Sequence, residues 1–243
     1  MVTLPENKKK EVTEKVGKKK VWIYGAPYCG KTYFANSFPD ALILSTDGNT
    51  EFCDSPSILI RDQVKVEGRI TTTKTAWEYF REIIAELEKK QNTYQTIVFD
   101  LVEDLYELCR ISKYKELGIK HESDDPFKAW DKIRSEFMST MRKAANMDYN
   151  IVFISHEDVK TDITSRSGDN VTAINPNIQP KIANKLAGLV DMTIRAVYEN
   201  GKRTLLIKPV GVMFGGVRIN NVPKEIPMTF NDFANLYNTT RSE

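Results

Sequence analysis

The stretch Gly25-Ala26-Pro27-Tyr28-Cys29-Gly30-Lys31-Thr32 matches the phosphate-binding pattern G-x-x-x-x-G-K-[ST], the P-loop. The apolar run before it, residues 20–24, predicts a short buried strand, and residues 32–37 can open a helix. A strand, a glycine-rich loop and a helix in this order form the context in which the pattern binds phosphate. A chance match in an ordinary glycine turn does not explain those flanks. The sequence therefore predicts a nucleotide site at the start of the first helix.

The residue types of this loop suit a bound polyphosphate. Gly25 and Gly30 let the backbone curl, so that successive N–H groups point inward, and the following helix directs its positive end at the same anion. Lys31 supplies a mobile positive charge for the β- and γ-phosphates, and the Thr32 hydroxyl is placed to bind Mg²⁺. We expect the nucleotide to contact Gly25, Ala26, Pro27, Tyr28, Cys29, Gly30, Lys31, Thr32 and Tyr33.

A second apolar strand, residues 94–100, ends in a carboxylate. Downstream of a P-loop this is the Walker B pattern, and we expect its strand to run beside the P-loop strand, so that Asp100 reaches the Mg²⁺ site. Glu103 and Asp104 follow within four residues. Either could polarise an attacking water, with Glu103 the better candidate, or both could occupy the first turn of the next helix, where negative charge is favourable.

Two more predicted strands end in polar residues. Residues 41–46 lead into Asp47, which could orient water from a strand beside the P-loop strand, or could form a turn with Gly48. Residues 150–156 end in Ser155 and His156, which could sense the γ-phosphate. The alternative for His156 is a hydrogen-bonded structural role.

Basic residues occur in two later segments. Residues 157–177 read as a long polar loop, which could carry DNA, a partner or a neighbouring subunit, with Lys160 and Arg166 as candidates for DNA contact. Residues 191–198 and 203–208 flank Asn200-Gly201, which predicts a β-hairpin. The basic side chains of this late region could reach a neighbouring subunit's nucleotide or simply face solvent: Arg203, Lys208 and Arg218.

Composition favours one soluble α/β domain. The chain has 243 residues, 41% of them hydrophobic, and a formal net charge of +2, so overall charge implies no polyanionic partner. Its three cysteines lack metal-site spacing and fit a reducing cytoplasm, and no apolar run is long enough for a membrane span. Helical periodicity predicts helices over residues 75–89, 101–117, 127–147, 178–189 and 230–237. We expect a basic flexible tail over 1–19, which could touch nucleic acid weakly, and one ATP-binding domain over 20–238.

With these motifs in view, the chain resembles phage-type ATPases with a RecA core in the AAA-like nucleotide-binding group. Some of them are described as single-strand annealing recombination proteins of the Sak group. The resemblance rests on residues 24–32, 43–48, 97–100 and 153–157. With the late hairpin and the Gly-Arg segment at 215–218, it spans roughly residues 20 to 237.

The resemblance implies a RecA-like fold: a mostly parallel sheet flanked by helices, with a C-terminal β-hairpin. It implies ATP and Mg²⁺ as cofactors and homo-oligomers with ATP at subunit boundaries. Asp47 stands where such proteins carry a water-activating Glu, so hydrolysis is expected to be slow. Ser155 and His156 stand at the γ-phosphate sensor, commonly Gln. The segment 157–177 corresponds to the DNA-binding loop, although its acidic residues weaken a simple phosphate clamp.

These inferences combine into one expected function and two alternatives. We expect a cytoplasmic Mg²⁺-ATP-binding protein, in the host cytoplasm if phage-encoded, that hydrolyses ATP slowly and acts on single-stranded DNA in recombination or replication. A single-strand-binding or other replication protein is a further expected partner. One alternative is a small-molecule or nucleotide kinase, for which residues 157–177 make a poor basic lid. The other is a module that binds ATP without hydrolysing it and thereby orders a surface for a partner.

Overall fold

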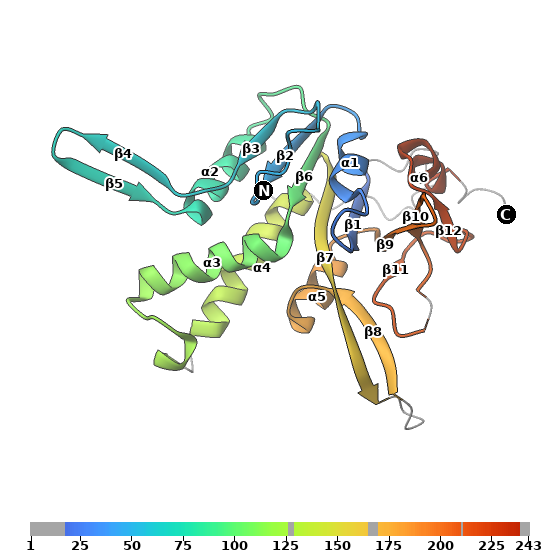
Figure 1. Ribbon diagram of the computed structural model, residues 1–243. Coiled ribbons are helices and arrows are strands. Elements are labelled where there is room, and N and C mark those ends of the chain that lie inside the picture. Colours follow the sequence, from blue (N-terminus) through green and yellow to red (C-terminus); the bar gives the residue numbers. More distant parts are fainter. Residues whose placement is uncertain (1–17, 126–128, 165–169, 210, 239–243) are drawn as a thin grey trace, which may run out of the picture.

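The P-loop strand lies inside a ten-stranded sheet in the computed structural model, which describes residues 18–125, 129–164, 170–209 and 211–238 (Figure 1). The order is β12-β10-β9-β1-β7-β6-β2-β3, with β8 added to β7 and β11 to β9. The six strands from β9 to β3 are parallel, and the additions are antiparallel. The strands are β1 (Lys20–Gly25), β2 (Ala41–Ser45), β3 (Ser57–Leu59), β6 (Thr96–Asp100), β7 (Asn150–Thr164), β8 (Asn170–Pro176), β9 (Met192–Glu199), β10 (Lys202–Leu206), β11 (Gly216–Val217) and β12 (Glu225–Pro227).

The strand order corrects one expectation. Strands β6 and β2 do not run beside β1, because β7 lies between β1 and β6, and β2 lies beyond β6. The register sets Gly25 beside His156, and Asp100 beside Ile154. Because the central strands are parallel, their carboxyl ends still meet along one edge, here called the carboxyl edge. The polar strand ends therefore come together even though their strands are not neighbours.

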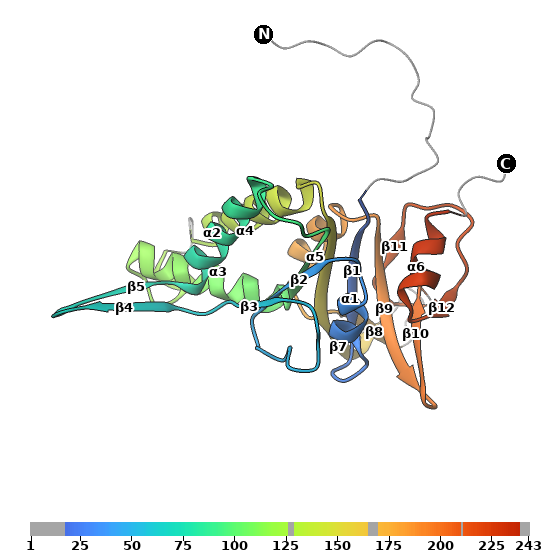
Figure 2. The ribbon, with the colours of Figure 1, turned by 90° about the horizontal axis from the view of Figure 1, so that it is seen from above.

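Helices cover both faces of the sheet (Figures 1 and 2). Alternating side chains of β1 explain the two layers, since Val21 and Ile23 belong to one apolar cluster and Trp22 to the other. Helices α1 (Lys31–Asn36) and α6 (Phe230–Leu236) pack on the Ile23 face. The Trp22 face carries α2 (Ala76–Glu88), α3 (Val102–Leu117), α4 (Ala129–Asn146) and α5 (Pro180–Ala187), and a short 3₁₀ helix, η1 (Glu122–Asp124), follows α3.

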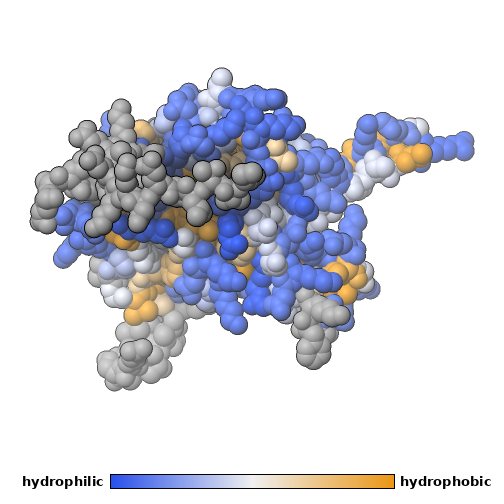
Figure 3. Space-filling view, turned by 180° about the vertical axis from the view of Figure 1, so that it is seen from behind, coloured by the Kyte–Doolittle hydropathy of each residue, from blue (hydrophilic) through white to orange (hydrophobic). Residues whose placement is uncertain are grey.

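An unpredicted hairpin projects away from the main sheet (Figure 1). It consists of β4 (Gln63–Glu67) and β5 (Ile70–Lys74), which pair only with each other among the described residues. Val64, Val66 and Ile70 are each about two-thirds exposed on it. Figure 3 shows these apolar atoms as a patch on the projecting arm. The hairpin buries almost nothing, so it lacks the half-buried alternation by which strands are recognised.

A second hairpin corrects the expectation of a loop over 157–177. Strand β7 continues past the sheet to Thr164 and returns as β8, with an irregularity between Lys160 and Ile163. The segment is therefore a β-hairpin that leaves the carboxyl edge, and residues 165–169 lie outside the described part. The predicted late hairpin is confirmed as β9 and β10, with Asn200 and Gly201 at positive φ in its turn.

The expected fold class is confirmed: a P-loop α/β domain with a mostly parallel sheet between helices and a late β-hairpin. Residues 1–17, most of the expected basic tail, lie outside the described residues. None of the helices in the described part of the chain has both the length and the apolar composition that a membrane span requires.

Candidate functional site

The P-loop has the backbone that its glycines predict. Gly30 has φ 98° and Tyr28 has φ 64°, both in the left-handed region, and helix α1 starts directly after the loop. Gly25 is required for a different reason, because a Cβ there would stand 2.3 Å from the carbonyl oxygen of Ala196 on β9. The first glycine thus lets β1 and β9 pack closely, and the second gives the loop its turn.

Lys31 is held inside the loop. Its Nζ donates to the carbonyl oxygens of Gly25 and Ala26, at 2.9 and 2.8 Å, and the residue is only 6% exposed. A buried ammonium needs such partners, since burying an unpaired charge is costly. The positive charge therefore stands within the loop, where the pattern places the phosphates.

Thr32 and Asp100 meet beside the loop. The Thr32 hydroxyl donates to Asp100 Oδ2 at 2.6 Å, although β6 lies two strands from β1. The pKa of Asp100 is raised to about 6, chiefly because the carboxyl is buried; the bond from Thr32 opposes this rise and the nearby charge of Asp47 adds to it. A hydroxyl and a carboxylate are hard oxygen donors of the kind Mg²⁺ prefers. The pair therefore fits a magnesium ion held beside nucleotide phosphates.

Asp47 is engaged in its own turn. Its Oδ1 accepts hydrogen bonds from the Ser45 hydroxyl and the Asn49 N–H, at 3.0 and 3.1 Å, and its Oδ2 accepts from the Asn49 amide at 2.6 Å. Burial raises the pKa of Asp47, but these bonds outweigh it and leave the pKa lowered. A carboxylate stabilised in its charged form is a weak base. The geometry matches the turn-forming alternative.

Glu103 is tied to the end of β7. Its Oε1 accepts the backbone N–H of His156 at 2.7 Å and lies 3.2 Å from the imidazole Nδ1. Its Oε2 is buried and has no hydrogen-bond partner among the described residues. Because β7 is the direct neighbour of β1, this carboxylate stands close to the start of the P-loop. It is oriented by one oxygen and has the other available.

Asp104 and Ser155 have structural partners. Asp104 accepts a hydrogen bond from the Thr46 hydroxyl at 2.8 Å, and burial raises its pKa. Ser155 is fully buried and its hydroxyl accepts the indole N–H of Trp22 at 3.0 Å. The Ser155 side chain therefore belongs to the packed interior, and of the two expected sensor residues only His156 is partly exposed.

The basic candidates lie in different places. Lys160 is on β7 within the projecting hairpin, Arg166 lies outside the described residues, and Lys208 is exposed just after β10. Arg218 donates to the Gly188 carbonyl at 2.6 Å, and its N–H bonds Asp191 near the start of β1, opposite the carboxyl edge. Arg203 lies against the P-loop of its own chain, beside Gly30.

An ion pair beside the P-loop was not expected from the sequence. Arg195 on β9 donates to both carboxylate oxygens of Glu157 on β7, at 2.8 and 3.3 Å, and both side chains are mostly buried. The pair spans the end of β1 and borders a hollow of about 250 Å³ that Ala26, Tyr28 and Tyr198 also line. An arginine inside the apolar run of β9 was a usable signal, since buried arginines are paired.

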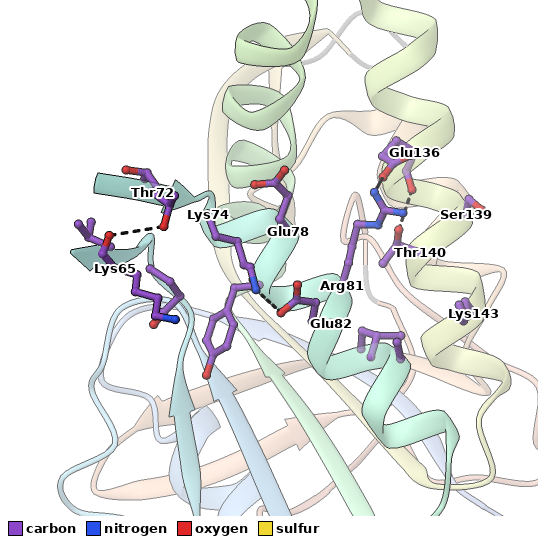
Figure 4. A pocket seen from close by; sticks show the side chains of 16 residues that line it. Lys65, Thr72, Lys74, Glu78, Arg81, Glu82, Glu136, Ser139, Thr140 and Lys143 are labelled. Carbon is purple, nitrogen blue, oxygen red and sulfur yellow. Dashed lines mark hydrogen bonds and ion pairs between the residues drawn. The ribbon is translucent and has the colours of Figure 1, made fainter. Parts of the chain in front are cut away.

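A larger hollow lies elsewhere. A groove of about 1100 Å³ runs between the β4–β5 hairpin and helices α2 and α4 (Figure 4). Two of its basic side chains are paired within it, Lys74 with Glu82 and Arg81 with Glu136, at 2.6 and 2.9 Å, and Lys65 and Lys143 pair with Glu67 and Glu88. Groups already neutralised in this way do not form a phosphate site. The P-loop edge is therefore the better candidate for nucleotide chemistry.

One family model and one solved structure show what this chain is similar to. A family model described as an AAA domain matches residues 17–219, a span that contains the P-loop, Asp100 and Glu103. The chain belongs to the AAA domain family. Among solved structures, this AAA domain is similar to the flagellar accessory protein FlaH from Methanocaldococcus jannaschii, with 10% identity, 79% of this chain and 77% of that chain covered, and a TM-score of 0.36. No curated protein matches this AAA domain.

Proposed function

We propose that this AAA domain binds Mg²⁺-ATP and hydrolyses it slowly. The observation that carries the proposal is the 2.6 Å bond between the Thr32 hydroxyl and Asp100, which joins two distant motifs at the P-loop. When bound, Mg²⁺ supplies positive charge that neutralises the phosphate oxygens. Thr32 and Asp100 are the residues that would hold it.

Charge placement and orientation explain how the other residues act. The Lys31 ammonium exchanges its two carbonyl partners for phosphate oxygens and stabilises their negative charge. Glu103, oriented through His156, directs its unpartnered Oε2 at the attacking water. Asp47 is the second candidate for this role, but both its oxygens already accept bonds from its turn. Phosphoryl transfer needs little more from a protein than positioning and charge.

The proposed target is single-stranded DNA, in recombination or replication. The β7–β8 hairpin supports this, because it leaves the carboxyl edge beside the P-loop (Figure 1), and Lys160 is one of its residues. We further propose a cytoplasmic homo-oligomer, in which Lys208 or Arg218 faces a neighbour's nucleotide, and a single-strand-binding protein as a further partner. These proposals rest on the resemblance described above and on the hairpin's position.

The test is ATP hydrolysis by the purified protein with and without single-stranded DNA. Lys31→Ala is the site variant, and Lys202→Ala, an exposed lysine on β10, is the matched control. We expect slow turnover that DNA stimulates, no turnover in Lys31→Ala and unchanged turnover in Lys202→Ala. Equal turnover in Lys31→Ala would refute the mechanism.

Two results would favour the other functions. Phosphate transfer to a nucleoside monophosphate would indicate a kinase. Nucleotide binding that depends on Lys31, without any turnover, would indicate a partner-binding module. An ATP hydrolysis rate that is the same with and without single-stranded DNA would support the ATPase proposal and contradict the DNA proposal.

A further inference from the structure

The P-loop has a charged residue on each side along the sheet. On one side Asp100 ends β6, two strands from β1, and bonds Thr32. On the other side Arg203 lies on β10, also two strands from β1. The Asp100 side is where Thr32 and Asp100 would hold Mg²⁺, which in P-loop proteins neutralises the charge of the β- and γ-phosphates. The opposite side therefore corresponds to the α-phosphate and the nucleoside.

Arg203 approaches the P-loop of its own chain closely. A Cβ placed on Gly30 would stand 2.7 Å from Arg203 Nε and 2.9 Å from its Cδ, so the side chain lies directly against the loop. The guanidinium also lies 5.0 Å from the ring centroid of Tyr198, its partner across the β9–β10 hairpin. Such cation–π contact holds an arginine without neutralising it.

The Arg203 charge has no carboxylate partner within the described residues, and the residue is exposed. A guanidinium offers a planar set of N–H donors that match phosphate oxygens. An unneutralised arginine against a phosphate-binding loop is thus suited to a phosphate of the ligand in that loop. From the sequence, Arg203 could reach a neighbouring subunit's nucleotide or face solvent, whereas in the structure it lies against the P-loop of its own chain.

We propose that Arg203 binds the α-phosphate of a nucleotide held in the P-loop of the same chain. The inference rests on the proposed nucleotide binding and adds a binding residue to it. Tyr198 is the positioning residue that holds the guanidinium over the loop. A contact at the α-phosphate is made equally with a triphosphate and a diphosphate, whereas a residue that reached a γ-phosphate would distinguish the two.

The experiment measures Kd for ATP and for ADP, each with Mg²⁺, in the wild type, Arg203→Ala and Lys202→Ala. The protein is kept below the concentration at which sedimentation detects association. We expect Arg203→Ala to raise the Kd for ATP and the Kd for ADP by the same factor, about 5- to 20-fold, because the variant loses a charge-assisted hydrogen bond. Lys202→Ala, one residue away on the same strand, should bind like the wild type.

Each other outcome has one meaning. A higher Kd for ATP with an unchanged Kd for ADP would overturn the α-phosphate assignment. Unchanged Kd values for both nucleotides would overturn any role of Arg203 in binding by the monomer. A wild type that binds neither nucleotide would instead refute the proposed function. Thermal unfolding of Arg203→Ala without nucleotide checks that the fold is intact, and Arg203→Lys should recover part of the affinity because it restores the charge.

Discussion

Glu103 accepts the backbone N–H of His156 at 2.7 Å, so the first turn of α3 is fastened to the strand that borders the P-loop strand. This bond orients the carboxylate through the backbone and does not depend on the imidazole. The helix start supplies the acid, and β7 fixes its position. A residue that the sequence left between two roles thereby acquires a specific place at the carboxyl edge.

Glu103→Gln should lower turnover and spare nucleotide binding. The amide oxygen can still accept the His156 N–H, but an amide cannot act as a base, so we expect kcat to fall by about 10²-fold or more. Kd for ATP should stay within a factor of two to three of the wild type, an order-of-magnitude expectation for an isosteric change. Steady-state kinetics and equilibrium binding measure the two quantities.

Asp47→Asn is the matched variant for this test. If Asp47 only stabilises its turn, the variant should keep most of the turnover and lose a little stability. A large loss of turnover in Asp47→Asn, together with an active Glu103→Gln, would move the water-orienting role to Asp47.

Asp100→Asn should stabilise the nucleotide-free protein at neutral pH. The pKa of Asp100 is raised to about 6 in the folded state, above its ordinary value of 3.8. Folding therefore favours the protonated form, and stability falls as pH rises from about 4 through 6. The variant should gain about 1–3 kcal/mol of unfolding free energy at pH 7.5, because two pKa units correspond to just under 3 kcal/mol.

Urea unfolding at pH 4 and pH 7.5, without Mg²⁺ and nucleotide, tests this directly. The gain in unfolding free energy should be small at pH 4, because Asp100 in the folded protein is then protonated and, like the asparagine of the variant, uncharged. An equal gain at both pH values would contradict the pKa explanation. The same variant should bind Mg²⁺-ATP less tightly, because it lacks the carboxylate charge.

Gly25→Ala should destabilise the fold as well as the site. The added methyl would stand 2.3 Å from the Ala196 carbonyl oxygen, and backbone cannot rotate away as a side chain can. We expect a loss of about 3 kcal/mol, at the upper end for overpacking. Gly216→Ala, which meets nothing within 4 Å, is the control and should unfold like the wild type. Similar melting temperatures for the two variants would disprove the requirement for close packing.

Replacing only Arg195 of the Arg195–Glu157 ion pair should lower the unfolding free energy more than replacing both residues. Arg195→Met leaves a mostly buried carboxylate without its partner, which typically costs about 3–5 kcal/mol. The double variant with Glu157→Met leaves no unpaired charge and should recover much of that loss. A double-mutant cycle by denaturant unfolding measures the coupling, and strictly additive losses would show that the two groups do not stabilise each other.

Local patterns predicted the elements well and their neighbours poorly. The P-loop, the strand ending in Asp100 and the Asn200-Gly201 hairpin each follow from a few adjacent residues. The insertion of β7 between β1 and β6 involves pairing over more than fifty residues, which no local pattern encodes. The nearness of Arg203 to Gly30 was missed for the same reason.

Two hairpins escaped prediction, the β4–β5 hairpin because its strands are exposed. Residues 63–74 have almost no buried face, so their periodicity resembles that of a loop, whereas the polar, turn-rich sequence of residues 157–177 predicted a loop where β7 in fact continues and returns as β8. Ser155 illustrates the reverse error, since a polar residue at a strand end suggested a ligand contact. Its hydroxyl instead satisfies the buried indole of Trp22.

Strand β7 is one element of fifteen residues, about 50 Å long at the usual rise per residue. Its first half is clamped between β1 and β6, and its second half pairs with β8 to form a hairpin. His156 lies where the clamped half ends. The same strand therefore connects the β7–β8 hairpin to the residue whose backbone N–H orients Glu103.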